Sequence, residues 1–331
     1  MRRISILMAA MAMIAQFAMA GNSKPTEPVF SRLAHTYSIV AYDSTTGQFG
    51  AAVQSHWFKV ADVIWVEPGI GAVATQSLVD FAYGPLGLEM MKNGKTARQA
   101  LAGLIASDPN PQVRQVAMID ARGNVATHTG EKCIAEAGHH QGRIYSVQAN
   151  LMRNNTVWDA MALAFETSGG DLADRMMAAL EAAEGEGGDI RGRQSAAMVV
   201  VSGEPTGMSW VDRIVDIRVD DSPEPLKELR RLLNITRAYD MMNQGDEYIA
   251  WKEFDQASEA YAKAAELAPG NLEVMFWHAV TLVTVGETER ALPIFKQVFE
   301  ADESWRELIP RLVEADLMPD DDALILQIVG E

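Results

Sequence analysis

The chain has 331 residues, of which 48% are hydrophobic and 7% aromatic, so it can build one large core with an appendage. Its formal net charge is −17, from 28 basic and 45 acidic residues. Nucleic acids and anionic lipid surfaces attract clustered Lys and Arg, and this acidic surplus therefore argues against both kinds of partner. We expect a globular protein of two domains that binds no nucleic acid.

The first twenty residues predict a secretory signal peptide (1–20). Arg2 and Arg3 form the positive start, a mostly apolar run spans 4–17, and a small–x–small pattern at 18–20 suggests a mature start at Gly21. The alternative is an N-terminal membrane anchor, but the run is short for a span and polar residues follow it at once. We therefore expect an exported protein without stable membrane insertion, in the periplasm or, alternatively, secreted.

Several familiar kinds of site find little support in the sequence. Cys133 is the single cysteine, so it cannot form an internal disulfide, and its context favours a buried inert thiol over a nucleophile. The six His residues show neither the His-x-x-x-His nor the His-Glu-x-x-His spacing of zinc sites. We expect neither a cofactor nor a metal, and a metal-dependent hydrolase stays open only as a third interpretation.

The chain changes character at Thr36. Residues 21–35 contain two prolines and scattered polar residues, which predicts a linker or pro-segment. Alternating apolar residues over 36–43 predict a strand, and residues 48–55 predict its hairpin partner after a turn. A third β region follows over 63–76 and contains a Pro-Gly turn.

The remaining elements of the first domain, expected over 36–221, indicate its class. Helices are predicted after Gly84-Pro85 and from Thr96, strands at 115–120, 125–128 and 144–148, helices at 156–167 and 171–184, and strands at 195–201 and 212–219. Strand hairpins, then helix pairs, then strands again favour a layered α+β fold over an alternating βαβ fold. No glycine-rich phosphate loop joins a strand to a helix.

The tail, expected over 225–331, is helical and carries an internal repeat. Ala257, Tyr261 and Ala264 recur 34 positions later as Ala291, Phe295 and Val298. This period resembles that of the tetratricopeptide repeat, although an unrelated helical hairpin is an alternative. Only about two units are visible, and three are usual for independent stability. We therefore expect the tail to pack on the first domain or on a second copy, and to offer a surface for a protein partner or homo-oligomer.

Polar residues close or open most of the predicted strands. They lie at 54–55, 75–76, 128–130, 148–150 and 189–195. Such groups can converge in one cleft, as an acyl-transfer site requires. Taken singly, each is more often a turn residue or a hydrogen-bonded structural group. The segment 188–195 is the strongest, since it places an acid, two arginines and an amide behind two glycines.

Five segments in order carry a resemblance to a known family. They are 36–43, 50–55, 71–76, 128–130 and 188–197, and together they resemble the bacterial domain-of-unknown-function family 1028 over roughly residues 35 to 220. That family is similar to the N-terminal-nucleophile hydrolases. The resemblance implies a four-layer αββα sandwich and an amidohydrolase acting on a small amide or peptide-like substrate.

The resemblance also implies roles for individual residues. Thr36 would be the catalytic nucleophile, with its own α-amine as base, because a free α-amine has a pKa of about 7.7–8.0 and can accept a proton near neutrality. The matching positions that would surround it are Ser55, Gln76, Asn150, Asp189, Arg191 and Gln194.

This chain departs from the family pattern, in which the threonine follows the initiator Met. Fifteen residues, 21–35, would still precede Thr36 after removal of the signal peptide. Catalysis therefore requires a second cut between His35 and Thr36. Without that cut Thr36 is an ordinary β-branched strand residue. The two leading interpretations are an amidohydrolase and a non-catalytic binding or scaffold protein that acts through its helical tail.

Overall fold

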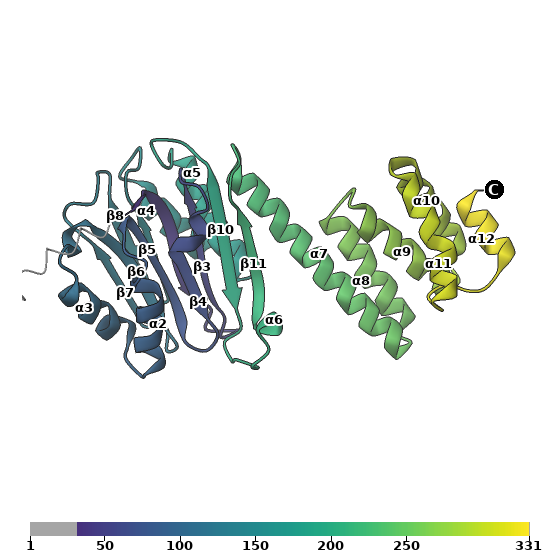
Figure 1. Cartoon of the computed structure of the whole chain (residues 1–331), viewed down its shortest axis with the longest axis horizontal. Helices are drawn as coiled ribbons and strands as arrows, with labels where there is room; N and C mark the ends of the chain where they lie inside the picture. Colours follow the sequence, from purple (N-terminus) through teal and green to yellow (C-terminus); the bar gives the residue numbers. More distant parts are fainter. Residues whose placement is uncertain (1–31, 331) are drawn as a thin grey trace, which may run out of the picture.

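The structure, a computed structural model, describes residues 32–330. The predicted signal peptide and most of the predicted linker or pro-segment lie outside the described residues. Figure 1 shows a mixed α+β domain at one end, a helical tail at the other, and one long helix that joins them. No helix within residues 32–330 is both long and apolar enough to cross a membrane.

The first sheet is antiparallel and is centred on β5. Its strands are β1 (Arg32–Ala34), β4 (Ile64–Glu67), β5 (Gly71–Val79), β6 (Arg114–Asp120) and β7 (Val125–Thr129). One edge of β5 pairs with β6. Its other edge is shared, because β4 pairs with residues 71–74 and β1 with residues 77–79.

The second sheet has six antiparallel strands in the order β11-β10-β3-β2-β9-β8. These strands are β2 (Thr36–Tyr42), β3 (Phe49–Ser55), β8 (Gly138–Gln141), β9 (Tyr145–Ala149), β10 (Ser195–Val201) and β11 (Arg213–Val219). The predicted hairpin is therefore present, with Thr36 opposite Ser55 in its register.

The alternation of side chains along β2 divides the core between its two faces. Ile39 and Ala41 pack with helices in one buried cluster, whereas Val40 packs against Ala74 and Ile119 of the first sheet in another. The helices on the second sheet are α4 (Val157–Thr167) and α5 (Leu172–Gly185), and those on the first are α2 (Tyr83–Lys92) and α3 (Ala97–Ser107). Thr36 and Ser38 share the face of Val40, so they point between the sheets.

Short elements complete this domain, and the sequence patterns predicted none of them. They are the 3₁₀ turns η1 (Val60–Val63) and η2 (Pro111–Val113), and helix α6 (Ser209–Asp212). Strands β1 and β8 were also not predicted. Each has only three or four residues, and β8 is half-exposed, so neither shows a readable alternation.

Helix α7 (Pro225–Trp251) belongs to both parts of the chain. At its start Leu226, Leu229 and Leu233 are buried in the same core cluster as α4, α5 and the second sheet. Arg230 and Arg237 of α7 also form ion pairs with acidic residues of α5 and with the residue that caps its N-terminus. At 1.5 Å per residue the helix is about 40 Å long, and it carries the tail away from the sheets (Figure 1).

The tail is a stack of antiparallel helices. It contains α8 (Phe254–Leu267), α9 (Leu272–Thr284), α10 (Thr288–Ala301), the 3₁₀ turn η3 (Glu303–Glu307), α11 (Leu308–Glu314) and α12 (Asp322–Val329). The repeated residues of α8 and α10 are all buried, as the 34-residue period predicts. Tyr261 packs on Gly245 of α7, where an added Cβ would lie 2.5 Å from the ring.

Candidate functional site

Thr36 stands where the chain passes from one sheet to the other. It is the first residue of β2 in the second sheet, and the residues just before it form β1 in the first. Thr36 is 0% exposed and His35 is 3% exposed. The Thr36 Oγ1 atom has no hydrogen-bond partner among the described residues. A buried hydroxyl without a partner costs free energy, so its presence calls for a reason.

The carbonyl group of His35 is held by two donors. Ser55 Oγ donates to this oxygen at 2.6 Å, and Arg191 Nη2 donates to it at 2.8 Å. The carbonyl belongs to the peptide bond between His35 and Thr36. Two donors at these distances polarise a carbonyl and stabilise negative charge that develops on its oxygen.

Asp189 positions the guanidinium of Arg191. Arg191 Nη2 donates to Asp189 Oδ2 at 2.6 Å, and Arg191 Nε donates to Asp189 Oδ1 at 3.0 Å. The Asp189 side chain is 0% exposed, whereas that of Arg191 is 30% exposed. The backbone N–H of His56 donates to the same carboxylate. This bidentate pair fixes the guanidinium plane and so aims one N–H at the His35 oxygen.

Buried amide side chains fill the space between the sheets beside Thr36. Gln76 Nε2 donates to the Thr36 carbonyl oxygen at 3.0 Å and to Gln115 Oε1 at 2.7 Å. Asn150 Nδ2 also donates to Gln115 Oε1, at 2.9 Å. Asn150 Oδ1 lies 2.9 Å from His35 Nδ1, so the imidazole donates this hydrogen bond. These contacts fix the amides on both sides of the His35–Thr36 bond.

Gln115 is the functional residue that the sequence patterns missed. Its Nε2 shares two N–H groups among three acceptors, Thr129 Oγ1 and the carbonyl oxygens of Gly138 and Ala149, and so links β6 to β7, β8 and β9. The available signal was an amide near the start of β6, directly before the apolar run 116–119. A fully hydrogen-bonded buried network of this kind holds its members in one arrangement.

Two strained backbone positions flank the amides. Ser77 follows Gln76 with φ of 73°, and Leu151 follows Asn150 with φ of 58°. Non-glycine residues rarely adopt positive φ, and such conformations persist where the surroundings enforce them. The strained residue in β5 lies within the strand, which continues to Val79, whereas the other lies just after the end of β9.

The structure brings together most of the residues that the sequence assigned to the site. Ser55, Gln76, Asn150, Asp189 and Arg191 all act on the His35–Thr36 segment, directly or through one neighbour. The Gln194 side chain is directed elsewhere, with Nε2 donating to Asp221 Oδ1 at 3.1 Å. Gln194 contributes through its backbone N–H, which donates to the carbonyl oxygen of Ser55.

The titratable groups near the site are few. Burial lowers the pKa of His35, which favours the neutral imidazole. Burial raises the pKa of the Cys133 thiol, whose Sγ donates to the Arg114 carbonyl, so this thiol stays protonated near neutral pH. No group of three or more His, Cys, Asp or Glu suited to a metal ion occurs in residues 32–330.

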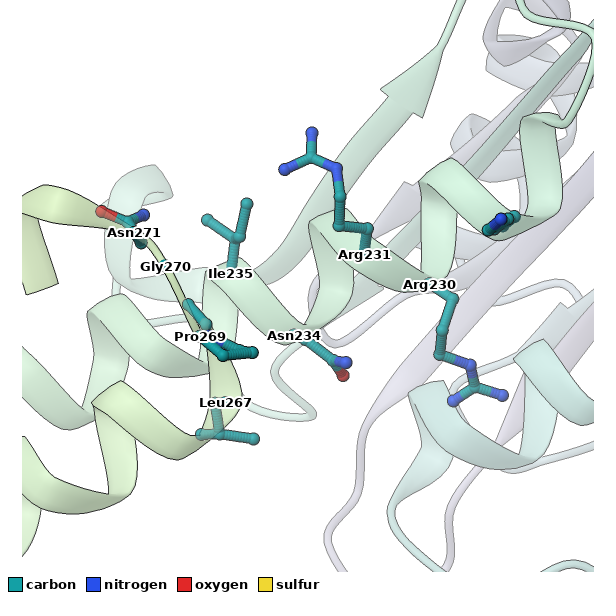
Figure 2. A pocket seen from close by; sticks show the side chains of 10 residues that line it. Arg230, Arg231, Asn234, Ile235, Leu267, Pro269, Gly270 and Asn271 are labelled. Carbon is teal, nitrogen blue, oxygen red and sulfur yellow. The ribbon is translucent and has the colours of Figure 1, made fainter. Parts of the chain in front are cut away.

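A cavity of about 500 Å³ lies far from Thr36, where α7 passes the turn between α8 and α9. Figure 2 shows Arg230, Arg231 and Asn234 of α7 on one side of it and the turn at 267–271 on the other. Arg230 pairs with acidic residues of α5, and Arg231 pairs with Glu228. Two of the three cations that line the cavity, Arg230 and Arg231, are therefore already neutralised, and Lys227 is the third. The cluster around Thr36 is the stronger candidate site, because its groups converge on one peptide bond.

Fold and site together define a class of protein. It is a two-sheet α+β domain, with a buried threonine at the start of a strand, followed by a helical repeat tail. The chain belongs to the family of unknown function DUF1028, whose model matches residues 36–229. A tetratricopeptide repeat model matches residues 241–271, which confirms the character of the tail. The family match starts at Thr36 itself.

One solved structure extends this comparison. The protein SPO2555 from Silicibacter pomeroyi, described as a DUF1028 protein, is 29% identical, with a TM-score of 0.54. The match covers 60% of this chain and 88% of that one. No curated protein matches the chain. The comparisons therefore identify the family and the tail but assign neither an activity.

Proposed function

We propose that this protein is an amidohydrolase of the N-terminal-nucleophile type, and that Thr36 cuts its own His35–Thr36 bond to become the nucleophile. One observation carries the proposal: the carbonyl of that bond is held by Ser55 and Arg191, while the neighbouring Thr36 hydroxyl has no partner. The two packed sheets with helices on their outer faces support it, because a four-layer αββα sandwich is the fold that the family resemblance implies.

The cut is an intramolecular acyl transfer. The Thr36 hydroxyl adds to the His35 carbonyl carbon, the carbon–nitrogen bond to Thr36 breaks, and the hydroxyl proton ends on the released amine. Water then hydrolyses the ester between His35 and Thr36 Oγ1. The segment that ends at His35, called the leader below, leaves with a free carboxylic acid, and the Thr36 hydroxyl is restored. Ser55 and Arg191 stabilise the negative oxygen that forms on His35 in both steps.

The same groups then serve a substrate. The new α-amine, with a pKa of about 7.7–8.0, accepts the proton of the Thr36 hydroxyl as this hydroxyl attacks an amide carbon. The substrate carbonyl takes the place of the His35 carbonyl between Ser55 and Arg191. The amine passes its proton to the leaving nitrogen, and water releases the acyl group from Thr36.

Hydrolysis of a panel of amides by four versions of the full chain tests the proposal. We expect turnover by the natural chain, partial turnover by Thr36→Ser, and none by Thr36→Ala. Thr45→Ala, in the exposed turn after β2, is the matched control and should retain full turnover. Turnover by Thr36→Ala equal to that of Thr45→Ala would exclude Thr36 as the nucleophile.

A binding or scaffold function is the second candidate, and the tetratricopeptide match over 241–271 favours it. Paired helices of this kind commonly present a surface to a protein partner. Trp251 is 64% exposed at the end of α7 and is a natural anchor for such a partner. If the chain is only a scaffold, Trp251→Ala weakens partner capture while Thr36→Ala leaves the cellular phenotype unchanged.

We also propose that the chain is exported, on the strength of the signal pattern over 1–20. Separation of periplasm, medium and cytoplasm from cells that express the full chain tests this. Replacing Arg2 and Arg3 with Glu should hold the protein in the cytoplasm. Export of that variant at the natural rate would rule out a signal of this type.

A further inference from the structure

One edge of β5 is completed by a piece of the leader. Along this edge β4 pairs with residues 71–74, and β1 pairs with residues 77–79 through the register Arg32 to Val79 and Ala34 to Ser77. Strand β1 precedes the His35–Thr36 bond. After the proposed cut it is no longer covalently attached, and when it leaves, the backbone groups of residues 77–79 lose their partner.

The leader makes a second contact with the domain through the side chain of His35. Its ring is buried, and Nδ1 donates to Asn150 Oδ1. The Asn150 amide is fixed because its Nδ2 is committed to Gln115. Removal of the leader therefore leaves a ring-sized space whose fixed polar group is a hydrogen-bond acceptor. Buried acceptors without a donor are costly, so this space favours a side chain that can donate.

The leader makes a third contact through the His35 carbonyl, which lies between Ser55 and Arg191. In one continuous segment the leader thus supplies a paired strand, a buried ring and a polarised carbonyl next to Thr36. These are the three contacts that the acyl side of a peptide substrate would make. A small amide would satisfy the carbonyl position but would leave the edge of β5 unpaired.

We propose that the substrate is an extended peptide whose acyl side adds as a strand to residues 77–79 of β5 and places a His at Asn150. The leader then acts as a built-in copy of the substrate. Main-chain pairing with a free strand edge supplies affinity, and the pocket for one side chain supplies selectivity. This inference rests on the proposed function, because it describes what the Thr36 site cleaves.

Fluorogenic amides test the proposal on the chain that begins at Thr36 after the cut and keeps its whole helical tail, called the processed chain below. The probe acetyl-Arg-Leu-Ala-His-coumarin amide copies residues 32–35, and acetyl-His-coumarin amide is its matched control. We expect kcat/KM for the longer probe to be at least about tenfold higher, from one to two additional backbone hydrogen bonds. Methylating the backbone nitrogens one at a time should remove this gain at one position or more, and replacing His with Leu should also lower kcat/KM about tenfold.

Binding of a labelled peptide to the edge of β5 gives an independent control, because the attached leader covers this edge in the uncut chain. Fluorescein-labelled Arg-Leu-Ala-His should bind the processed chain and compete with the substrate. It should not bind full-length Thr36→Ala, in which the attached leader holds the edge. Leu33→Pro added to Thr36→Ala weakens β1 pairing and should restore binding, whereas Leu33→Ala should not.

The outcomes separate this inference from the proposed function. Thr36-dependent hydrolysis with equal kcat/KM for the long and short probes overturns the extended-peptide substrate and leaves the amidohydrolase intact. Absence of hydrolysis together with an uncut leader overturns the proposed function. In that case binding of the labelled peptide to the Leu33→Pro, Thr36→Ala chain decides. Binding that depends on the His supports a peptide site along residues 77–79 with a pocket at Asn150, and no binding overturns that site.

Discussion

At the scale of single residues, the site is a set of donors aimed at one carbonyl. Ser55 and Arg191 bind the His35 oxygen, and Asp189 orients the guanidinium through two hydrogen bonds. The sequence places Gln194 in the same polar segment as Asp189 and Arg191, but its side chain bonds to Asp221. This contrast provides matched variants for a test of the donors.

Removing one donor should slow the cut at His35–Thr36. We expect Ser55→Ala and Arg191→Met each to lower its first-order rate about 10²–10³-fold, the usual effect of losing one oxyanion donor. Gln194→Ala should keep the natural rate. Mass spectrometry of samples quenched over time measures release of the leader. Equal rates for Ser55→Ala and Gln194→Ala would mean that the His35 oxygen needs no such donors.

Docking of the leader should weaken in mild acid. Burial lowers the pKa of His35, Arg191 adds to this effect, and Asp189 and the Asn150 hydrogen bond oppose it. A lowered pKa means that the undocked state binds the proton more tightly. Stability from docking is therefore complete above the ordinary pKa of about 6.5 and is lost as the pH falls below it.

Hydrogen exchange of residues 77–79 in uncut Thr36→Ala measures this docking. After correction for intrinsic exchange, we expect less protection at pH 5.5 than at pH 7.5. His35→Gln can still donate to Asn150 but does not titrate, so its protection should not change with pH. An equal loss of protection in both chains would place the titrating group elsewhere.

At the scale of elements, patterning explains what the sequence could predict. The β2–β3 hairpin and helix α3 have clear periodicity, and α3 begins with a capping box at Thr96. Strand β1 has three residues and forms only because β5 offers an edge. Its pairing depends on residues more than forty positions away in the sequence, so no local sequence pattern predicts this strand. Gln115 was missed for a related reason, since its partners come from other strands.

The packing of Gly245 against Tyr261 gives a prediction for the repeat tail. An added Cβ at Gly245 would lie 2.5 Å from the Tyr261 ring, whereas one at Gly169 would meet nothing within 4 Å. We expect Gly245→Ala to destabilise the tail by about 1–3 kcal/mol and Gly169→Ala to be nearly neutral. Chemical denaturation followed by tail tryptophan fluorescence compares the two. An unchanged midpoint for Gly245→Ala would contradict this packing.

At the scale of the whole molecule, α7 makes the two parts interdependent. Its first turns lie in the core of the α+β domain, and its later residues Ala238 and Met242 lie in a core cluster of the tail. The change of composition near 220–225 therefore marks where the helix begins, not where the packing of the first domain ends. The family match to residue 229 agrees with this.

The position of a truncation should decide whether the first domain survives. A chain that ends at Glu224 loses Leu226, Leu229 and Leu233 from its core, at about 1.5–3 kcal/mol for each side chain. A chain that ends at Asp240 keeps all three. We expect the longer fragment to melt cooperatively and the shorter one to melt at least about 10 °C lower or to aggregate. Equal melting temperatures would show that α7 is dispensable to this core.

The central claim is that Thr36 becomes the N-terminus by its own chemistry. The most direct measurement is the intact mass of the purified uncut chain, followed over time at several protein concentrations. We predict conversion to a chain that begins at Thr36, with a first-order rate that is independent of concentration and absent in Thr36→Ala. A natural chain that keeps residues 21–35 while it hydrolyses amides, or Thr36→Ala cut at the natural rate, would contradict the claim.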